Sequence, residues 1–250
     1  MISAIIITKN EEENIEKCLS SISWVDEIII VDSGSNDRTE EISRKYTNNF
    51  YFNEWIGFGP QKQFCLEKAT QRWILSIDAD EIVTKELKIE INNIISTPNS
   101  LDGYLIPRLS SYLGKNMKYC GWYPDYTLRL ARRSKCNFTN DLVHERLKVK
   151  SDKVGKLNHH FLHSPYKNIH HQIDKIQQYS SSSAIQMSKK GKKIFWLTIF
   201  IKTTYSFVRS FVFQRGFIAG WRGLVLSITI SINTFLKYVK LKELNIKDNK

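Results

Sequence analysis

The chain has 250 residues, 42% of them hydrophobic and 12% aromatic, and a formal net charge of +12. The hydrophobic content excludes an intrinsically disordered chain, and the length allows one large domain or one domain with an appendage. The charge is unevenly spread, because residues 1–150 hold 20 Lys and Arg against 21 Asp and Glu, whereas residues 151–250 hold 17 against 4. A near-neutral first part and a basic second part indicate two different roles.

The N-terminus and the cysteines indicate a cytosolic chain with reduced thiols. The first eight residues lack the basic start and the long apolar core of a signal peptide, so we expect the first part of the chain to stay in the cytoplasm. The cysteines form neither a C-x-x-C pair nor a zinc-type spacing with histidine. They are Cys18, Cys65, Cys120 and Cys136. We expect these thiols to be reduced and mostly buried.

Short apolar runs alternate with helical patterns along the first seventy residues. The predicted strands cover residues 2–8, 27–31 and 51–55. The predicted helices cover a segment that ends at Ser23 and residues 39–46 and 61–70. Asn10 is the candidate cap of the first helix. This alternation predicts an α/β fold with a parallel sheet and right-handed crossovers.

The apolar run 73–77 ends abruptly at Asp78-Ala79-Asp80, and a helix is predicted at 85–96. A buried parallel strand followed by two carboxylates places both at the carboxyl edge of the sheet, where ligands bind in open α/β folds. Two such carboxylates suit Mg²⁺ or Mn²⁺. The alternative is that Asp78 or Asp80 caps the following helix.

Asp32 and Lys62 are further candidate ligand-binding residues. Asp32 follows the second strand and suits a hydrogen bond to a ribose or a base, although a turn or cap residue before Gly34 is equally expected. Lys62 stands near the start of a helix and suits a diphosphate, with a solvated surface lysine as the alternative. The turn after the first strand, residues 8–11, contains no glycine, which argues against a dinucleotide-binding fold.

Three motifs in the first eighty residues resemble the nucleotide-sugar half of family 2 glycosyltransferases, which have the GT-A fold. They are Ile5-Ile6-Ile7-Thr8-Lys9-Asn10-Glu11, Ile30-Val31-Asp32-Ser33-Gly34-Ser35-Asn36-Asp37-Arg38-Thr39 and Asp78-Ala79-Asp80-Glu81. The residues 121–130 and Val143-His144-Glu145 resemble a narrower branch that contains lipopolysaccharide-core β-1,4-glucosyltransferases. The resemblance covers nearly the whole chain, including residues 215–238.

The resemblance implies roles for individual residues in the nucleotide-sugar site. Thr8, Asn10 and Glu11 would line the nucleotide pocket, and Asp32 would hold the base or the ribose. Asp78 would contact the ribose or a metal-bound water, and Asp80 would bind the Mg²⁺ or Mn²⁺ that bridges the donor's two phosphates. His163 matches the place of a further metal ligand, with a packing or surface histidine as the alternative.

Strands are predicted at 103–107 and 126–131, and inverting sugar transfer requires a general base that takes the proton of the acceptor hydroxyl. The family's usual Glu-Asp pair is missing here, and only Asp125 precedes Leu128-Arg129-Leu130. Asp125 is the first candidate base and Glu145 the second. The alternative for Asp125 is a salt bridge to Arg129 or Arg132.

The aromatic residues between these strands suit either sugar stacking or the core. They are Tyr112, Tyr119, Trp122 and Tyr123. A helix is predicted at 169–187, and a basic cluster at 189–193 precedes two apolar stretches, 194–213 and 217–238, that are interrupted by basic residues. These stretches suit helices lying on an anionic membrane surface. The alternatives are a pair of helices packed on the enzyme's own core and, less favoured, a spanning helix. The tail is too apolar for nucleic acid.

Together these observations predict a GT-A fold with a nucleotide-sugar half (1–100), an acceptor half (101–188) and a basic amphipathic helical tail (189–250). The expected activity is transfer of a hexose with inversion, with UDP-glucose as the expected donor and a lipid-linked or lipopolysaccharide-core saccharide as the acceptor. The expected location is the inner face of the cytoplasmic membrane. The alternatives are another acceptor (polyprenyl phosphate, capsule or protein), a nucleotidyltransferase, or a non-catalytic scaffold.

Overall fold

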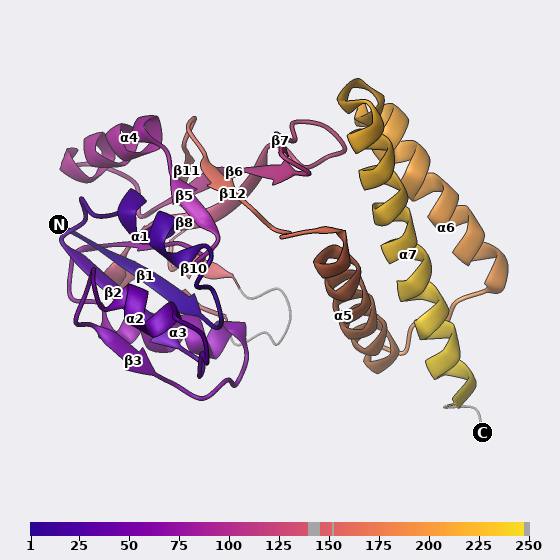
Figure 1. Ribbon diagram of the computed structural model, residues 1–250, viewed down its shortest axis with the longest axis horizontal. Helices are drawn as coiled ribbons and strands as arrows, with labels where there is room; N and C mark the ends of the chain where they lie inside the picture. Colours follow the sequence, from indigo (N-terminus) through magenta and orange to yellow (C-terminus); the bar gives the residue numbers. More distant parts are fainter. Residues whose placement is uncertain (140–145, 152, 248–250) are drawn as a thin grey trace. The chain divides into compact units, whose positions relative to one another are not determined.

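The computed structural model describes residues 1–139, 146–151 and 153–247 (Figure 1). The chain forms two compact units. Unit 1 comprises Met1–Leu109 and Pro124–His163, and unit 2 comprises Ser110–Tyr123 and Ser164–Lys250. The three functional parts predicted from the sequence stay a prediction, because compactness does not test which part binds which substrate.

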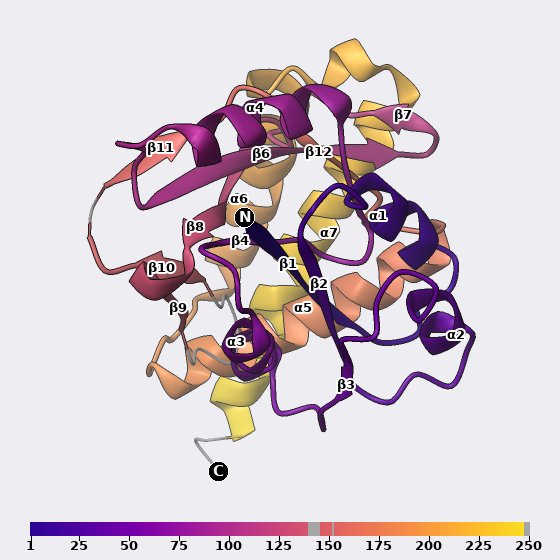
Figure 2. The same cartoon turned by 90° about the vertical axis from the view of Figure 1, so that its left-hand side faces the viewer.

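Unit 1 is built on a mixed sheet with the strand order β3-β2-β1-β4-β8-β6-β12-β5. β1 (Ile2–Thr8) lies between β2 (Glu27–Asp32) and β4 (Trp73–Ser76) and is parallel to both (Figure 2). β3 (Phe50–Phe52) pairs with β2, also in parallel. Since parallel strands end at the same edge, the last residues of β1, β2 and β4 lie along one side of the sheet.

The rest of the sheet is largely antiparallel. β8 (Asp125–Arg132) runs antiparallel to β4 and to β6 (Gly103–Tyr112), and β12 (Phe161–His163) runs antiparallel to β5 (Glu81–Val83). The shorter strands lie beside these. They are β7 (Lys115–Asn116) and β11 (Val154–Lys156), both paired with β6, and the separate pair β9 (Cys136–Phe138) and β10 (Leu147–Val149).

The core of unit 1 has two layers because successive strand residues face opposite sides of the sheet. Ala4 and Ile6 of β1 pack in one layer with α1 (Ile15–Ser21), α2 (Thr39–Ser43) and α4 (Lys85–Ser96). Ile5 packs in the other layer with α3 (Phe58–Lys68). Both faces are covered, which explains why β1 is a continuous apolar run. All four cysteines are buried free thiols, as the sequence predicts.

Unit 2 consists mainly of three helices, α5 (Ile169–Lys189), α6 (Trp196–Val208) and α7 (Trp221–Lys247). A π-helical turn, η2 (Arg209–Phe213), and a 3₁₀ turn, η3 (Gly216–Ala219), join α6 to α7. α7 packs against both other helices. Hydrogen bonds between polar side chains reinforce this packing. They join Gln172 to Thr229 at 2.9 Å, Ser210 to Ser227 at 3.0 Å and Ser206 to Thr234 at 3.1 Å.

Most predicted elements are confirmed, some with shifted ends. The strand 2–8 and the helix 85–96 have the predicted bounds. The predicted strand 51–55 is instead Phe50–Phe52, and the helix 61–70 begins earlier, at Phe58, because Gly57 precedes it with a φ of 117° that favours glycine. The helix 169–187 extends to Lys189. β5, β7 and the short strands β9 to β12 were not predicted.

Two predicted helix caps are wrong. α1 begins at Ile15, and Asn14 is its N-cap. Asn10 lies in the preceding loop with a φ of 55°, and its side chain accepts a hydrogen bond from the Asn36 N–H in the loop after β2. Neither Asp78 nor Asp80 caps α4, because β5 intervenes and Thr84 is the N-cap, whose hydroxyl accepts the free N–H of Leu87. The two aspartates are therefore available for another role.

Candidate active site

Hydrogen bonds join the two loops that follow β1 and β2. The Asn10 N–H donates to the Ser35 hydroxyl at 2.8 Å, and the Asn36 N–H donates to Asn10 Oδ1 at 2.9 Å. The Glu11 N–H donates to the Thr39 hydroxyl at 2.8 Å. Asn10 and Glu11, which the sequence places in a nucleotide pocket, therefore shape the carboxyl edge of the sheet by tying its loops together.

Thr8 is the last residue of β1 and pairs in register with Asp32 of β2. Its side chain is buried, and its hydroxyl has no hydrogen-bond partner among the residues that the structure describes. A buried hydroxyl without a partner costs about 1–3 kcal/mol. The unpaired hydroxyl therefore marks a place at this edge where a polar ligand group would be accommodated favourably.

Asp32 forms the turn at the end of β2. One of its carboxylate oxygens accepts the N–H groups of Gly34 and Ser35 at 2.8 and 2.7 Å, and the other accepts the Ser35 hydroxyl. Gly34 has a φ of 85°, which a residue with a side chain rarely adopts. The turn interpretation of Asp32 is thus confirmed, and its contact with a base or ribose stays a prediction.

Asp78 lies between two cations. Lys62 Nζ is 3.0 Å from Asp78 Oδ1, and Arg129 Nη2 donates to Asp78 Oδ2. Burial raises the pKa of Asp78, but the charges of Arg129 and Lys62 outweigh this effect and hold the pKa well below its usual range. The side chain of Lys62 is only 11% exposed, so the solvated-surface interpretation of this lysine is wrong.

Glu81 is fully buried next to this group. Its carboxylate accepts the Asp78 N–H and a hydrogen bond from Arg129 Nη2, each at 2.9 Å, and lies 3.6 Å from Arg108 Nη1. Burial raises the pKa of Glu81, and the charge of Arg129 opposes that rise. Glu81 begins β5, whose pairing with β12 holds it in place.

Asp125 begins β8, directly across from Arg108 of β6. Arg108 donates two hydrogen bonds to Asp125 Oδ2, from Nε at 2.9 Å and from Nη2 at 2.5 Å. The predicted alternative, a salt bridge from Asp125 to Arg129 or Arg132, is wrong in its partner. Arg129 lies against Asp78, and Arg132 lies 3.7 Å from Asp102. The other candidate base, Glu145, lies outside the described residues.

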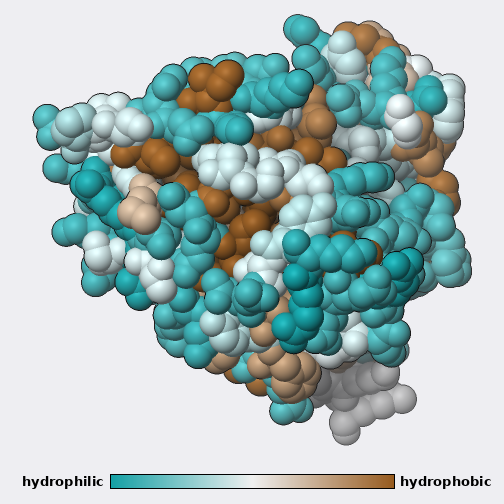
Figure 3. Space-filling model, turned by 60° about the vertical axis from the view of Figure 1, so that its left-hand side comes forward, coloured by the Kyte–Doolittle hydropathy of each residue, from teal (hydrophilic) through white to brown (hydrophobic). Residues whose placement is uncertain are grey.

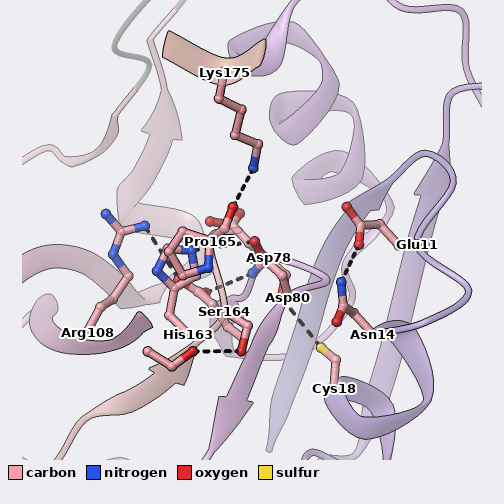
Figure 4. A network of polar contacts seen from close by, with 12 residues as sticks. Glu11, Asn14, Cys18, Asp78, Asp80, Arg108, His163, Ser164, Pro165 and Lys175 are labelled. Atoms are coloured by element: carbon pink, nitrogen blue, oxygen red, sulfur yellow. Dashed lines mark hydrogen bonds and ion pairs between the residues drawn. The ribbon is translucent and has the colours of Figure 1, made fainter. Parts of the chain in front are cut away.

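Asp80 lies in the turn between β4 and β5, and His163 is the last residue of β12. The two side chains point toward each other (Figure 4). Asp80 Oδ2 is 3.5 Å from His163 Nε2. Neighbouring ligands of a divalent ion with bonds of about 2.1 Å lie about 3 Å apart, so this pair fits Mg²⁺ or Mn²⁺. Within the described part of the chain, no third acidic, histidine or cysteine side chain completes such a group. Mg²⁺ sites often have few protein ligands, because substrate phosphates and water supply the others.

Three residues of this cluster had no assigned role in the sequence-based site: Arg108, Arg129 and Glu81. Glu81 ends the Asp78-Ala79-Asp80-Glu81 motif, and Arg129 stands in the motif around Asp125, where the sequence offers it only as an alternative salt-bridge partner of Asp125. Arg108 lies outside every motif. Its position opposite Asp125 depends on the register of β6 against β8.

Comparisons with known proteins show which family this chain resembles. Residues 3–145 match the family model described as glycosyl transferase family 2. An uncharacterised glycosyltransferase of Rickettsia typhi is 31% identical over 98% of this chain and 88% of its own length. The lipopolysaccharide core biosynthesis glycosyltransferase LpsC of Rhizobium meliloti is 30% identical over 96% of this chain and 91% of its own length. A crystal structure of Staphylococcus aureus TarS in complex with UDP-GlcNAc has a TM-score of 0.49 and 15% identity, over 99% of this chain and 92% of that one.

Proposed function

The chain belongs to glycosyl transferase family 2 and has the GT-A fold, and we propose that it transfers a hexose with inversion from a nucleotide-diphosphate sugar to a lipopolysaccharide-core saccharide. The similarity to LpsC, which extends over nearly the whole of both chains, supports lipopolysaccharide core biosynthesis. Glucose is the proposed sugar and UDP-glucose the proposed donor. The observation that carries the proposed chemistry is the charged cluster around Asp78, just past the carboxyl end of β4, where Lys62, Arg129 and Glu81 meet.

The proposed donor site uses the loops after β1 and β2. The Thr8 hydroxyl, unpaired among the described residues, and the carboxylate of Asp32 would hold the nucleoside, which sits where ligands bind in open α/β sheets. Lys62 and Arg129 would face the diphosphate, whose negative charge increases as the bond to the sugar breaks. Both cations are already held in place by Asp78, so they need little reorganisation in the transition state.

Asp80 and His163 would hold a divalent ion, Mg²⁺ or Mn²⁺. When bound, such an ion supplies positive charge that stabilises the departing diphosphate. The 3.5 Å separation of the two side chains supports this assignment.

Asp125 is the proposed general base. Its side chain is 44% exposed, so an acceptor hydroxyl is able to approach it from solvent. The carboxylate takes the hydroxyl proton while the hydroxyl oxygen attacks the anomeric carbon, and the diphosphate leaves with the bonding electron pair. The two hydrogen bonds from Arg108 fall on Oδ2 and orient the carboxylate for this step.

We also propose a peripheral location on the inner face of the cytoplasmic membrane, where a lipid-linked acceptor is accessible. Unit 2 carries many exposed apolar side chains, including Phe195, Trp196 and Phe200 on and before α6. Residues 151–250 hold 17 Lys and Arg against 4 Asp and Glu, a charge that complements anionic lipid. By length and composition alone, α7 is able to cross a membrane over Trp221–Ile246, a range that contains an 18-residue window with a mean hydropathy of 1.4.

The experiment that tests the function begins with the donor. Purified full-length chain is screened by thermal shift against UDP-, GDP- and dTDP-sugars with Mn²⁺, and a bound donor raises the midpoint because it stabilises the folded state. The stabilising donor is then incubated with lipopolysaccharide-core acceptors of defined length, and the product is identified by mass spectrometry and by the anomeric coupling in NMR. Absence of transfer to every core acceptor would contradict the proposed acceptor class.

The choice of base is tested by two isosteric substitutions. Asp125→Asn is expected to lower kcat by about 10²- to 10⁴-fold, because the amide is unable to accept the proton. Glu145→Gln is expected to leave kcat within a few fold of the wild-type value. The opposite result would assign the base to Glu145.

A further inference from the structure

Six charged side chains of unit 1 form a chain in which positive and negative groups alternate. In order, they are Lys62, Asp78, Arg129, Glu81, Arg108 and Asp125. The successive distances between the nearest charged atoms are 3.0, 2.5, 2.9, 3.6 and 2.5 Å. Three cations and three carboxylates compensate one another. The two ends of this ion chain are the proposed diphosphate-facing lysine and the proposed base.

Glu81 is the member of this ion chain that solvent and substrate do not reach, because its side chain is 0% exposed. A buried carboxylate is strongly unfavourable unless cations and hydrogen bonds compensate its charge. Here Arg129 and Arg108 supply the charge and the Asp78 N–H supplies a further hydrogen bond. The sequence-based site gives Glu81 no role, although it is the residue that both arginines share.

Arg129 and Arg108 would keep different carboxylate partners if Glu81 lost its charge. Arg129 keeps Asp78 as a second carboxylate partner. Arg108 keeps only Asp125 among the carboxylates of the ion chain, so its whole charge then falls on the proposed base. Glu81 therefore limits how strongly Arg108 holds Asp125.

We propose that Glu81 is a positioning residue for sugar transfer, which acts through Arg108 to hold Asp125 in the geometry and charge balance that a general base needs. This inference rests on the proposed function, because it assigns the partner of the proposed base. Glu81 is suited to this role because β5 is paired with β12, so its carboxylate is fixed by the sheet rather than by a loop.

The test is Glu81→Gln in the full-length chain, which removes the charge and keeps the size of the side chain. We expect kcat to fall roughly tenfold to a hundredfold, as small misplacements of reacting groups do, while the Kd for the donor, measured by calorimetry, changes less than about threefold. The matched control is Glu27→Gln. Glu27 also accepts hydrogen bonds, from the Ser3 hydroxyl and the Thr70 N–H, but at the start of β2, on the opposite edge of the sheet. Its kcat should equal that of the wild type.

A double-variant cycle separates positioning from general loss of stability. If Glu81 acts through Arg108, the loss of kcat caused by Glu81→Gln becomes much smaller in an Arg108→Gln background. Additive losses in the two backgrounds would overturn the proposal. So would a Glu81→Gln chain that unfolds at a lower temperature but turns over at the wild-type rate per folded molecule.

A second variant serves if Glu81→Gln does not fold. Arg108 is 22% exposed, and Arg108→Lys keeps its charge but loses the fork that reaches two carboxylates. It is expected to lower kcat per folded molecule about tenfold or more, and a wild-type kcat would overturn the inference. A wild-type chain without transferase activity would refute the proposed function itself, whereas an active wild type with an equally active Glu81→Gln would refute the positioning role alone.

Discussion

Thr8 carries a buried hydroxyl at the predicted nucleotide pocket. Its hydroxyl is buried at the end of β1, 5% of the residue is exposed, and the hydroxyl has no partner among the described residues. The buried Thr8 hydroxyl does not stabilise the folded state, because burying a polar atom without a hydrogen bond is unfavourable. A residue of this kind is expected where a bound molecule supplies the missing hydrogen bond.

Thr8→Val tests this expectation, because valine has nearly the same shape and lacks the hydroxyl. The free enzyme should become more stable, by up to about 1 kcal/mol, since an unpaired buried polar group is removed. The Kd for the nucleotide sugar should rise about tenfold if the hydroxyl bonds to it, because such a bond is worth about 1.4 kcal/mol. Urea unfolding and calorimetry measure the two effects. An unchanged Kd would place the ligand elsewhere.

Glu90 of α4 makes the folding stability of unit 1 depend on pH. It accepts the N–H groups of Asn158 and His159, each at 2.9 Å. Burial raises the pKa of Glu90, but these hydrogen bonds and the His159 side chain lower it below its ordinary value overall. A carboxylate whose pKa is lower in the folded state stabilises the protein above its unfolded pKa of about 4.3 and loses this effect as the pH falls toward the folded value.

Glu90→Gln should therefore be less stable than the wild type at pH 7, and the difference should shrink as the pH falls below about 4. The urea midpoints of the two proteins, measured at several pH values between 7 and 3, provide the comparison. A difference that stays constant over this range would show that the hydrogen bonds, rather than the charge, account for the stabilisation.

At the scale of elements, the start of α7 depends on a close approach to η3. A Cβ added to Gly223 would lie 1.8 Å from the Gly216 carbonyl oxygen, and one added to Gly216 would lie 2.8 Å from Cys120 Sγ and 2.9 Å from the Ser210 carbonyl oxygen. The Gly216 carbonyl oxygen is a backbone atom, so it cannot move away from an added Cβ as the end of a flexible side chain can. These two glycines therefore allow α7, η3 and the segment around Cys120 to pack in unit 2.

Gly223→Ala should destabilise unit 2 by about 1–3 kcal/mol or more, although alanine is the better helix former, because the added methyl group overlaps a carbonyl oxygen. Leu224→Ala is the control, since Leu224 is the next residue of α7 and is exposed. Thermal unfolding followed by circular dichroism at 222 nm measures both variants. If Gly223→Ala is as stable as the control, the close approach is not required.

At the scale of the whole molecule, the exposed apolar side chains need an explanation. Figure 3 shows hydrophobic patches within a largely hydrophilic face. In unit 2, α7 turns its polar residues Ser227, Thr229 and Ser231 inward, where they hydrogen-bond to the other helices. Exposed apolar residues remain on α6 and nearby, such as Trp196 and Phe200. This distribution suits a bundle that lies on a membrane.

The full-length chain should therefore bind vesicles that contain anionic lipid, and binding should weaken as salt screens the basic residues. The double variant Trp196→Ser/Phe200→Ser should bind at least about tenfold more weakly, since each buried aromatic contributes roughly 1.5–3 kcal/mol. Phe52→Ser in unit 1, where Phe52 is also exposed, is the control. Vesicle flotation measures all three proteins, and equal binding of the double variant and the wild type would contradict this membrane surface.

The sequence by itself determined the features that depend on neighbouring residues. The strand Ile2–Thr8 and the helix Lys85–Ser96 have the predicted bounds, because an unbroken apolar run and a helical residue pattern are local signals. The family was also visible, because its motifs are short segments at strand ends. These signals place Asp32, Asp78 and Asp80 at one edge of the sheet.

Only the tertiary structure decided which charged groups meet. Asp78 and Arg129 are 51 residues apart, and Arg108 and Asp125 are 17 apart, so their pairing depends on the neighbours and the register of β4, β8 and β6. Register follows from packing of the whole sheet, and a shift by one residue would reverse the direction of every side chain on a strand. Local patterns name the charged residues, whereas the folded sheet selects their partners.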